Sequence, residues 1–382
     1  MSTPAHGPLD WDFSAPQSPA LGDHEVEELS GHLRGQRIAL LVCGGVAAMR
    51  SVLLVRALRR RGAQVQVFCS ADALRFVGRE ALEWASAGEV ITHLTWRAEH
   101  LGEGAGFAAY VVAPATYNSI GKAAQGIADS LIAAVLASAL GRLQRGQSQV
   151  LMVPTMHGSM HHQVLTDNCR RLAAMGVRFV RPLDSAGKHH WPAEDFIVAA
   201  VCASLSQGAL RDQPALVCAS TQPQALALAQ ATHEALLLAG AHSQALLCAE
   251  GWSLSSSLPQ HALPNREPWR AACAAALESL PKQSLVVMDA DMARSNGAPQ
   301  SLRTCFLMAR STLLPQGADK PLWLGLRVIA ETSPWQWQVL GSGLDQAGHE
   351  VLLSQGPLPA EGSDWTAWRG AAAALLAACA AS

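Results

Sequence analysis

The sequence lacks the features that would place a protein on a nucleic acid or in a membrane. Its 28 basic and 30 acidic residues nearly cancel, and neither sign forms a long run. This balance offers no surface for nucleic acid or an anionic membrane. The apolar runs fall short of the roughly 18 to 20 residues that a membrane helix needs. The N-terminal stretch also lacks the basic start and apolar core of a signal peptide, so we expect a cytoplasmic protein.

Metal-binding and disulfide patterns are missing as well. The 9 cysteines are scattered without zinc-ligand spacing, so we expect buried, reduced thiols. Histidines occur in the adjacent pairs His161–His162 and His189–His190. Adjacent side chains diverge and rarely share a metal, so we expect these to be loop or surface histidines and predict no metal site.

The patterns that are present predict two α/β domains. The chain has 382 residues, 49% of them hydrophobic, which is enough for two well-filled cores. Residues 1–34, rich in Pro, Ser, Gly and acidic residues, are expected to be a partly disordered N-terminal extension in which 23–33 could form a short helix. Over residues 35–206, strands alternate with helices and predict a doubly wound parallel sheet, with strands at 37–43, 64–69, 110–113, 149–153 and 177–180 and helices at 119–140 and 164–175.

The alternating pattern restarts after residue 207. Residues 214–382 therefore predict a second, Rossmann-like α/β domain. Its first strand ends near Cys218 and is followed by no glycine-rich loop. Without glycine the backbone cannot approach a phosphate closely, which argues against nucleotide binding in the usual place.

The stretch from Tyr110 to Asp129 is the most informative part of the chain. It predicts a strand that Pro114 ends, followed by a helix that opens with Thr116, Asn118 and Ser119. The carboxyl end of a parallel strand followed by a helix N-terminus is where a phosphorylated ligand docks in open α/β sheets. An ordinary capped helix with no ligand is the alternative reading of the same residues.

This stretch resembles the flavin-binding signature of the homo-oligomeric flavin-containing cysteine decarboxylase superfamily. The resemblance is closest to the flavoprotein half of the bifunctional phosphopantothenoylcysteine decarboxylases/synthetases. It rests on Pro114, Ala115, Thr116, Asn118, Ile120, Lys122, Gly126, Ile127, Ala128 and Asp129. It implies a flavodoxin-like domain at 35–206 that binds FMN, acts on a small molecule and assembles into a trimer-based homo-oligomer.

The resemblance also implies which residues contact the flavin. The turn after the first strand and a serine after the second strand correspond to Gly44, Gly45, Val46, Ala47, Ser51 and Ser70. The main signature adds Ala115, Thr116, Asn118, Ser119 and Asp129. Backbone N–H groups and hydroxyls at these positions suit a phosphate without a lysine.

Two histidines are the implied catalytic residues. His100 stands fourteen residues before Pro114, where the resembled enzymes carry their essential histidine, and could act as acid or base. His157 stands where those enzymes place the asparagine that binds the substrate carboxylate. The chain also departs from them in having no cysteine between Cys169 and Cys202, where they carry a flap cysteine.

Residues 214–382 resemble the synthetase half only weakly. They lack its lysine cluster and its Asn-Arg-Ser-Ser-Gly loop, so we expect a degenerate synthetase-like domain and no CTP-dependent ligase. Three hypotheses remain for the chain. The first is an FMN enzyme that oxidatively decarboxylates a cysteine-like thiol substrate. The second is an FMN-dependent reductase or electron-transfer flavoprotein, for example acting on a dihydropterin. The third is a non-catalytic flavoprotein subunit.

Overall fold

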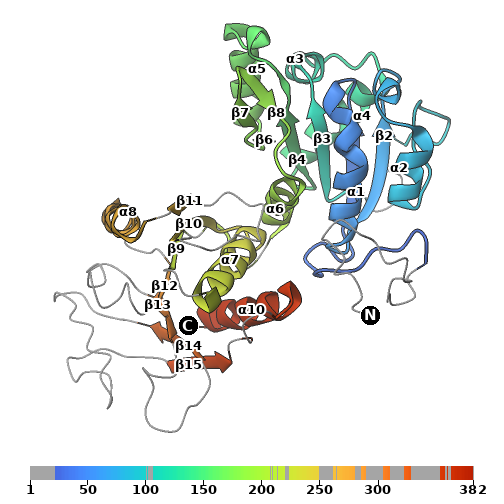
Figure 1. Cartoon of the computed structure of the whole chain (residues 1–382). Helices are drawn as coiled ribbons and strands as arrows, with labels where there is room; N and C mark the ends of the chain where they lie inside the picture. The colour runs from blue at the N-terminus through green and yellow to red at the C-terminus, as the bar shows by residue number, and fades with distance from the viewer. Residues whose placement is uncertain are drawn as a thin grey trace, which may run out of the picture.

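The computed structural model describes two α/β units that follow each other along the chain (Figure 1). The described residues are 22–99, 101, 106–206, 208, 210–212, 214–219, 223–248, 261–263, 265–279, 285–289, 304–309, 322–327, 353–357, 359 and 363–381. His100, the expected acid or base, lies outside them. Within these ranges, every helix is too short or too polar to span a bilayer.

The first unit is built on a five-stranded parallel sheet. Its strands are β1 (Arg37–Val42), β2 (Gln64–Cys69), β3 (Ala109–Ala115), β4 (Gln149–Pro154) and β6 (Arg178–Phe179). They lie in the order β2-β1-β3-β4-β6, with every neighbouring pair parallel. Taken in chain order this is 2-1-3-4-5, the flavodoxin-like arrangement. The predicted doubly wound sheet is confirmed.

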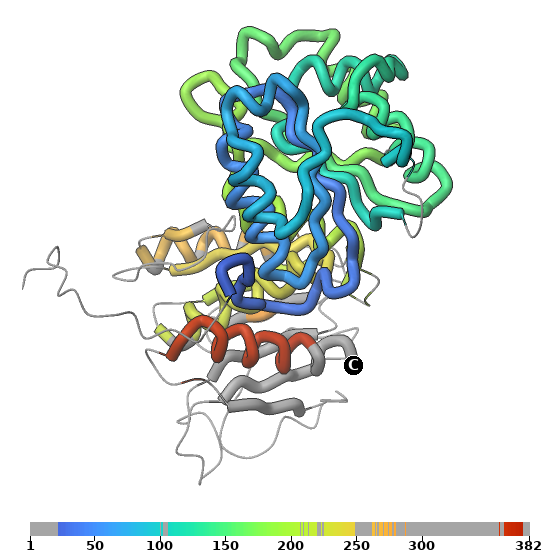
Figure 2. Tube along the Cα trace, turned by 90° about the vertical axis from the view of Figure 1, so that its right-hand side faces the viewer, coloured from blue at the N-terminus to red at the C-terminus, as the bar shows by residue number. Residues whose placement is uncertain are grey.

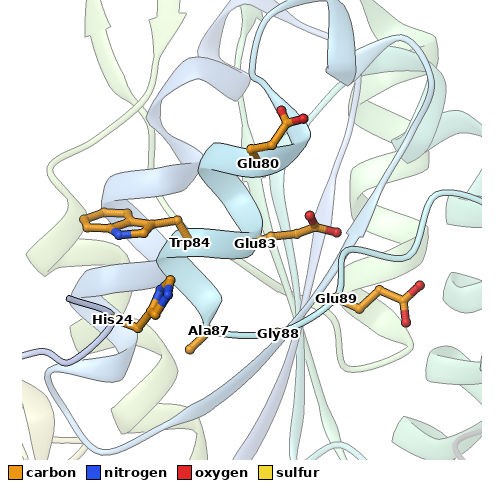
Figure 3. Close-up of a pocket in the computed structure, with 7 residues that line it drawn as sticks. All are labelled: His24, Glu80, Glu83, Trp84, Ala87, Gly88 and Glu89. Atoms are coloured by element: carbon orange, nitrogen blue, oxygen red, sulfur yellow. The ribbon is translucent and has the colours of Figure 1, made fainter. Parts of the chain in front are cut away.

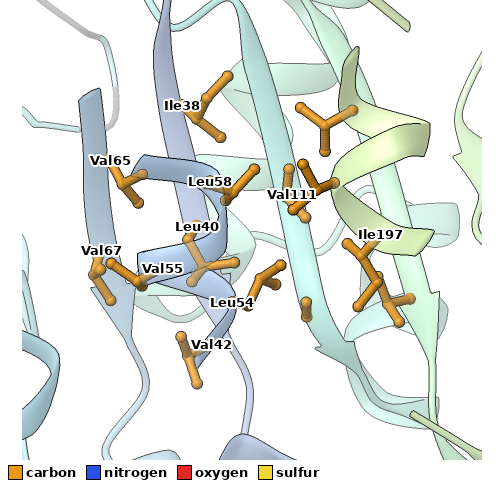
Figure 4. Packing of buried hydrophobic residues seen from close by; sticks show 14 of the residues in the cluster. Ile38, Leu40, Val42, Leu54, Val55, Leu58, Val65, Val67, Val111 and Ile197 are labelled. Carbon is orange, nitrogen blue, oxygen red and sulfur yellow. The ribbon is translucent and has the colours of Figure 1, made fainter. Parts of the chain in front are cut away.

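Helices cover both faces of this sheet because successive strand residues point to opposite sides. In β1, Ile38 and Leu40 pack toward α1 (Ser51–Arg59), whereas Ala39 and Leu41 belong to the core on the other face. Figure 4 shows the first of these cores, with Leu54 and Leu58 of α1 lying between the strands and Ile197. The first core also receives α2 (Arg79–Ser86) and α6 (Glu194–Leu205), and the second receives α3 (Tyr117–Gln125), α4 (Leu131–Gln144) and α5 (Gln163–Ala174).

Three expectations about element boundaries were wrong. Pro114 does not end the strand, because β3 continues to Ala115 with a register shift against β4 at the proline, which has no N–H to donate. The single helix expected at 119–140 is two helices, since α3 ends at Gly126 in the left-handed region (φ 70°) and Ser130 caps α4. Residues 23–33 form no helix. Leu33 there is fully buried in the first core.

A small antiparallel sheet, which was not predicted, stands beside the carboxyl edge of the main one. It joins β5 (Met156–His157), β8 (Lys188–His190) and β7 (Leu183–Ser185) in that order. The β7–β8 turn places Ala186 and Gly187 at φ 46° and 69°, as in a type I′ hairpin. The turn residues most typical of such hairpins are Asn-Gly and Asp-Gly. Because Ala186 occupies the first turn position here, the sequence does not show the usual hairpin pattern.

The second unit has a seven-stranded sheet in the order β11-β10-β9-β12-β13-β14-β15. β9 to β13 are parallel, and β14 and β15 run antiparallel to their neighbours, so the parallel part has the Rossmann order 3-2-1-4-5 and confirms the predicted class. The strands are β9 (Pro214–Ala219), β10 (His242–Cys248), β11 (His261–Leu263), β12 (Leu285–Asp289), β13 (Thr304–Ala309), β14 (Leu322–Arg327) and β15 (Leu353–Pro357). The helices are α7 (Pro223–Leu238), α8 (Arg266–Ser279) and α10 (Trp365–Ala381).

The two units meet where α6 packs against α7. A buried ion pair crosses this junction, with Arg61 of the first unit 2.6 Å from Glu234 on α7. Arg369 of α10 lies 3.1 Å from the same carboxylate, and the Trp365 indole N–H donates to it. Figure 2 shows the first described residues passing over α10 here, beside a cavity of about 550 Å³.

Candidate functional site

The strand order predicts a ligand-binding crevice at the carboxyl edge of the first sheet. β1 lies between β2 and β3, so the chain leaves β1 on one side and β3 on the other. In open α/β sheets this switch point is where ligands bind, because the two loops part there. The turn after β1, the turn after β2 and the start of α3 are therefore the walls of the candidate site.

The turn after β1 requires glycine at its first position, Gly44, for close packing. A Cβ added at Gly44 would lie 2.4 Å from the Asp72 Cβ, which no real contact tolerates. One added at Gly45 would lie 3.6 Å from Thr116 Cγ2, so this turn contacts the turn after β3. The 3-10 helix η1 (Val46–Arg50) starts directly after Gly45, and its first N–H groups have no partner within the helix.

The start of α3 is held by a capping box. The Thr116 hydroxyl accepts from the Ser119 N–H at 3.2 Å, and the Ser119 hydroxyl accepts from the Thr116 N–H at 2.9 Å. Both hydroxyls are therefore used by the backbone, and Ser119 is buried. Asn118, one residue before Ser119, is exposed. Among the α3 side chains that were predicted to bind the ligand, the Asn118 amide is therefore the one that could reach it.

The other predicted ligand residues lie at different depths. Ala115 is fully buried as the last residue of β3, and Ser70 caps the turn after β2 by accepting from the Ala73 N–H at 3.2 Å. Ser51 is also fully buried, with its hydroxyl directed at the Ala113 carbonyl at 3.4 Å. Asp129 lies on the exposed loop after α3 and pairs with Lys122 at 2.7 Å, which holds the Asp129 pKa below its usual range.

Two thiols lie at the ends of β1 and β2. Burial raises the pKa of Cys43 to about 11, although the Ser119 side chain and the Thr116 backbone hydrogen-bond to it. Burial, with Cys43 as a neighbour, raises the pKa of Cys69 to about 12. Both therefore stay protonated at neutral pH and are poor nucleophiles. The expectation of buried, reduced cysteines is confirmed for these two.

The loop from Pro154 to Met160 brings His157 to the small sheet. His157 Nδ1 accepts from the Ser159 N–H at 3.1 Å and contacts the Ser159 hydroxyl at 2.7 Å. Because Nδ1 accepts, Nε2 is the ring nitrogen left to donate. The Gly158 N–H donates to the Gly187 carbonyl at 2.8 Å, and a Cβ at Gly158 would clash with that oxygen at 2.4 Å.

Comparison with known proteins fits this arrangement. The model of the Flavoprotein family matches residues 26–206. We therefore call residues 26–206 the Flavoprotein domain. The resemblance inferred from Tyr110 to Asp129 is confirmed.

Curated relatives of the Flavoprotein domain are bifunctional proteins of coenzyme A biosynthesis. CoaBC from Thermococcus kodakarensis is 33% identical over 195 residues, which cover 50% of this chain and 47% of that protein. CoaBC from Bacillus subtilis is 31% identical over 157 residues, which cover 39% of this chain and 37% of that protein. The matched part of this chain therefore spans less than half the length of either relative.

Solved structures are similar over the same share of the chain. The crystal structure of the FMN-dependent cysteine decarboxylase SpaF aligns with a TM-score of 0.40 and 23% identity, covering 46% of this chain and 99% of SpaF. The peptidyl-cysteine decarboxylase EpiD aligns with a TM-score of 0.38 and 17% identity, covering 44% of this chain and 98% of EpiD.

A histidine cluster next to the Flavoprotein domain's crevice was missed. His161 Nδ1 lies 2.7 Å from His189 Nε2, and His189 Nδ1 lies 2.6 Å from Asp184 Oδ1. The side chain of His162 points the other way, to the Tyr117 hydroxyl at 3.4 Å. Adjacent histidines do diverge as expected. The sequence could not show that the β7–β8 hairpin places His189, which belongs to the other histidine pair, within hydrogen-bond distance of His161.

A hollow lies beside edge strand β2, away from the predicted ligand crevice (Figure 3). Its lining is acidic and aromatic, with Trp84 stacked under the Arg56 guanidinium. The lining residues are His24, Glu80, Glu83, Trp84, Ala87, Gly88 and Glu89. Across the described parts of the chain, no three histidine, cysteine or acidic side chains are arranged to hold a metal.

Proposed function

We propose that the Flavoprotein domain binds FMN in the crevice between the turn after β1 and the start of α3. The observation that carries this proposal is the 2-1-3-4-5 strand order, which puts both turns at the switch point. A Cβ at Gly45 would be in van der Waals contact with Thr116, so the starts of η1 and α3 lie side by side there. The N–H groups at the start of a helix suit a phosphate because they carry partial positive charge.

The residues around this site suit the FMN phosphate mainly through their backbone N–H groups, and less through their side-chain hydroxyls. The N–H groups of Val46 and Ala47 would hold the phosphate, with Ser70 at the neighbouring turn and Asn118 supplying an amide. Thr116, Ser119 and Ala115 would shape the crevice wall. Ser51 and Asp129 would act indirectly, Ser51 from beneath the turn and Asp129 through its pairing with Lys122.

We infer that the reaction is decarboxylation of a cysteine-like thiol acid. Bound FMN would supply the oxidation, as the acceptor of a hydride equivalent from the substrate; loss of the substrate carboxylate as carbon dioxide would then leave an enethiol. His100 is proposed as the acid or base. His157 is proposed to orient the carboxylate by donating a hydrogen bond from Nε2–H, because its Nδ1 is occupied by Ser159. The coenzyme A biosynthesis role of the CoaBC relatives supports a thiol substrate.

The first test is the absorbance spectrum of the purified full-length protein, followed by anaerobic addition of cysteine-bearing acids. We expect bound FMN, bleaching of its absorbance and release of carbon dioxide. The His100→Asn variant should keep the flavin and lose about 10²-fold or more in turnover. Full turnover by that variant would contradict the role of His100. A protein that takes up no FMN would contradict the proposed function itself.

A flavin reductase is the second candidate. It is favoured by two departures from the resembled decarboxylases: His157 stands in place of their asparagine, and no cysteine lies between Cys169 and Cys202. Bleaching of the flavin by NAD(P)H but not by thiol acids, with turnover of a dihydropterin, would select it. A pure flavin-loaded protein that reacts with neither would select the non-catalytic subunit.

We also propose that the domain forms a homo-oligomer through the outer side of η1 and α1. Val46, Met49 and Leu53 are 63%, 55% and 56% exposed and follow each other at helical spacing. This apolar stripe borders the crevice, so a second copy packed on it would also cover the ligand. We expect a trimer by light scattering.

The Leu53→Glu variant should reduce the trimer to monomers, because a charge in an apolar interface is costly. Val164→Glu, at a 54% exposed position on α5, is the control that should leave the mass unchanged. A monomeric wild-type protein with bound FMN would contradict the oligomer.

A further inference from the structure

Asp184, His189 and His161 form a continuous hydrogen-bonded chain on the small sheet. The Asp184 carboxylate is 2.6 Å from His189 Nδ1, and His189 Nε2 is 2.7 Å from His161 Nδ1. The two imidazole rings are 5.0 Å apart between centroids. Beyond them, the Thr166 hydroxyl lies 3.4 Å from His161 Nε2. Three elements supply these groups, since β7 carries Asp184, β8 carries His189, and His161 precedes α5.

The partners determine where the protons lie. The Asp184 carboxylate can only accept, so His189 Nδ1 must carry a hydrogen. In the neutral ring His189 Nε2 then accepts, and His161 must donate to it from Nδ1. The lone pair on His161 Nε2 is left facing Thr166 across a long, weak hydrogen bond. The chain of groups thus has one basic end, at His161, and one anionic end, at Asp184.

The residue next to His161 contacts the helix that borders the proposed ligand site. His161 and His162 are adjacent, and the ring of His162 contacts Tyr117, the first residue of α3, with ring centroids 5.6 Å apart. One histidine of this pair therefore contacts the helix that forms the crevice wall, and the other contacts the hairpin. The anionic end is open to water, because the side chain of Asp184 is 58% exposed.

We propose that Asp184, His189 and His161 form a proton relay between bulk water and a weakly acidic group, such as a thiol, of the ligand in the crevice. This inference rests on the proposed function for its substrate. The S–H bond of the ligand breaks and its proton forms a bond to His161 Nε2. The hydrogen on His161 Nδ1 passes to His189 Nε2. His189 becomes an imidazolium beside the Asp184 carboxylate, and no electrons are transferred.

The surroundings of the pair do not supply a competing carboxylate at the basic end. Asp167 on α5 is engaged by Gln163 at 2.7 Å and by Arg170 at 3.7 Å. His190 is directed back to the Ser185 carbonyl at 3.2 Å. The titratable or charged groups on the elements next to the pair are His157 on β5, Lys188 and His190 on β8, Asp167 and Arg170 on α5, and His162 with Tyr117.

The tautomers give a test that needs no flavin. In histidine-labelled full-length protein, ¹⁵N NMR should show His161 and His189 both protonated on Nδ1, whereas His157 should be protonated on Nε2. If His161 or His189 carries its proton on Nε2, the relay is overturned.

Turnover then tests its role. His161→Gln should lower kcat about 10²-fold, leaving KM and FMN binding unchanged. Asp184→Asn should lower kcat about tenfold and move the acid limb of the pH profile to lower pH, because the imidazolium loses its anion. His190→Gln, on the same hairpin, is the control with wild-type kcat. Full kcat in His161→Gln overturns the relay, whereas a protein without FMN overturns the proposed function and leaves the relay to be decided by the tautomers.

Discussion

Thr116 and Asn118 stand two positions apart in the same signature, yet the structure gives them different tasks. Thr116 is the N-cap of α3 and exchanges hydrogen bonds with Ser119. Asn118 is exposed on the first turn of the helix. From the sequence both were predicted to contact the flavin. The structure separates a residue that builds the site from one that can reach into it.

Substitution to alanine should separate the two roles. Thr116→Ala should lower the free energy of unfolding by about 1 kcal/mol, the usual cost of a lost N-cap. Asn118→Ala should leave the free energy of unfolding within about 0.5 kcal/mol and weaken FMN binding. Urea unfolding of the flavin-free protein and FMN titration measure the two effects. Equal FMN affinity in Asn118→Ala and wild type would remove the amide from the site.

At the scale of elements, the turns after β1 and β2 are packed directly against each other. Gly44 has no room for a side chain because Asp72 occupies the space where its Cβ would be. The first turn can therefore keep its position beside α3 only with glycine there. The doublet was predicted as a ligand-binding turn, and the structure adds the steric reason for its first residue.

Gly44→Ala should displace the turn and weaken FMN binding by at least about tenfold, which corresponds to 1.4 kcal/mol. Overpacking of this kind should also lower the free energy of unfolding by about 1–3 kcal/mol. Gly88→Ala is the matched control, since a Cβ there meets nothing within 4 Å. Unchanged flavin affinity in Gly44→Ala would show that the turn lies outside the site.

At the scale of the whole molecule, Glu234 connects the two units. It is buried, which by itself would raise its pKa, but Arg61 and Arg369 outweigh the burial and lower the pKa below the usual glutamate value. Arg61 is only 2% exposed and comes from the other unit. Removing the carboxylate would leave a buried guanidinium without its charge partner.

Glu234→Gln should therefore lower the free energy of unfolding by about 3–5 kcal/mol. The folded-state pKa of Glu234 is lowered, so its stabilisation is complete above about pH 4.3 and is lost as the pH falls from there through the folded value. The free energy of unfolding of Glu234→Gln should therefore not show this loss at low pH.

Glu28→Gln is the control. It breaks an exposed pair with Arg34 and should lower the free energy of unfolding by at most about 1 kcal/mol. Urea titrations between pH 3 and 7 measure both. Equal stability of Glu234→Gln and wild type would exclude the pair as a link between the units.

The sequence by itself determined the class of both units, because buried parallel strands such as Arg37–Val42 are continuous apolar runs and the helices between them are amphipathic. It also identified the turn at Gly44 and the start of α3, since glycines and capping residues act locally. The prediction of where α3 ends was wrong, because a glycine such as Gly126 can either lie within a helix or terminate it.

Contacts between distant segments were decided only by the tertiary structure. The pairing of His161 with His189, of Arg61 with Glu234 and of Gly44 with Asp72 depends on how strands and helices pack. The residues on either side of each partner in the sequence do not show which distant residue it contacts. The same residue types also occur on solvated surfaces. The fold could therefore be predicted from periodicity. The proton path and the junction between the units arise from packing alone.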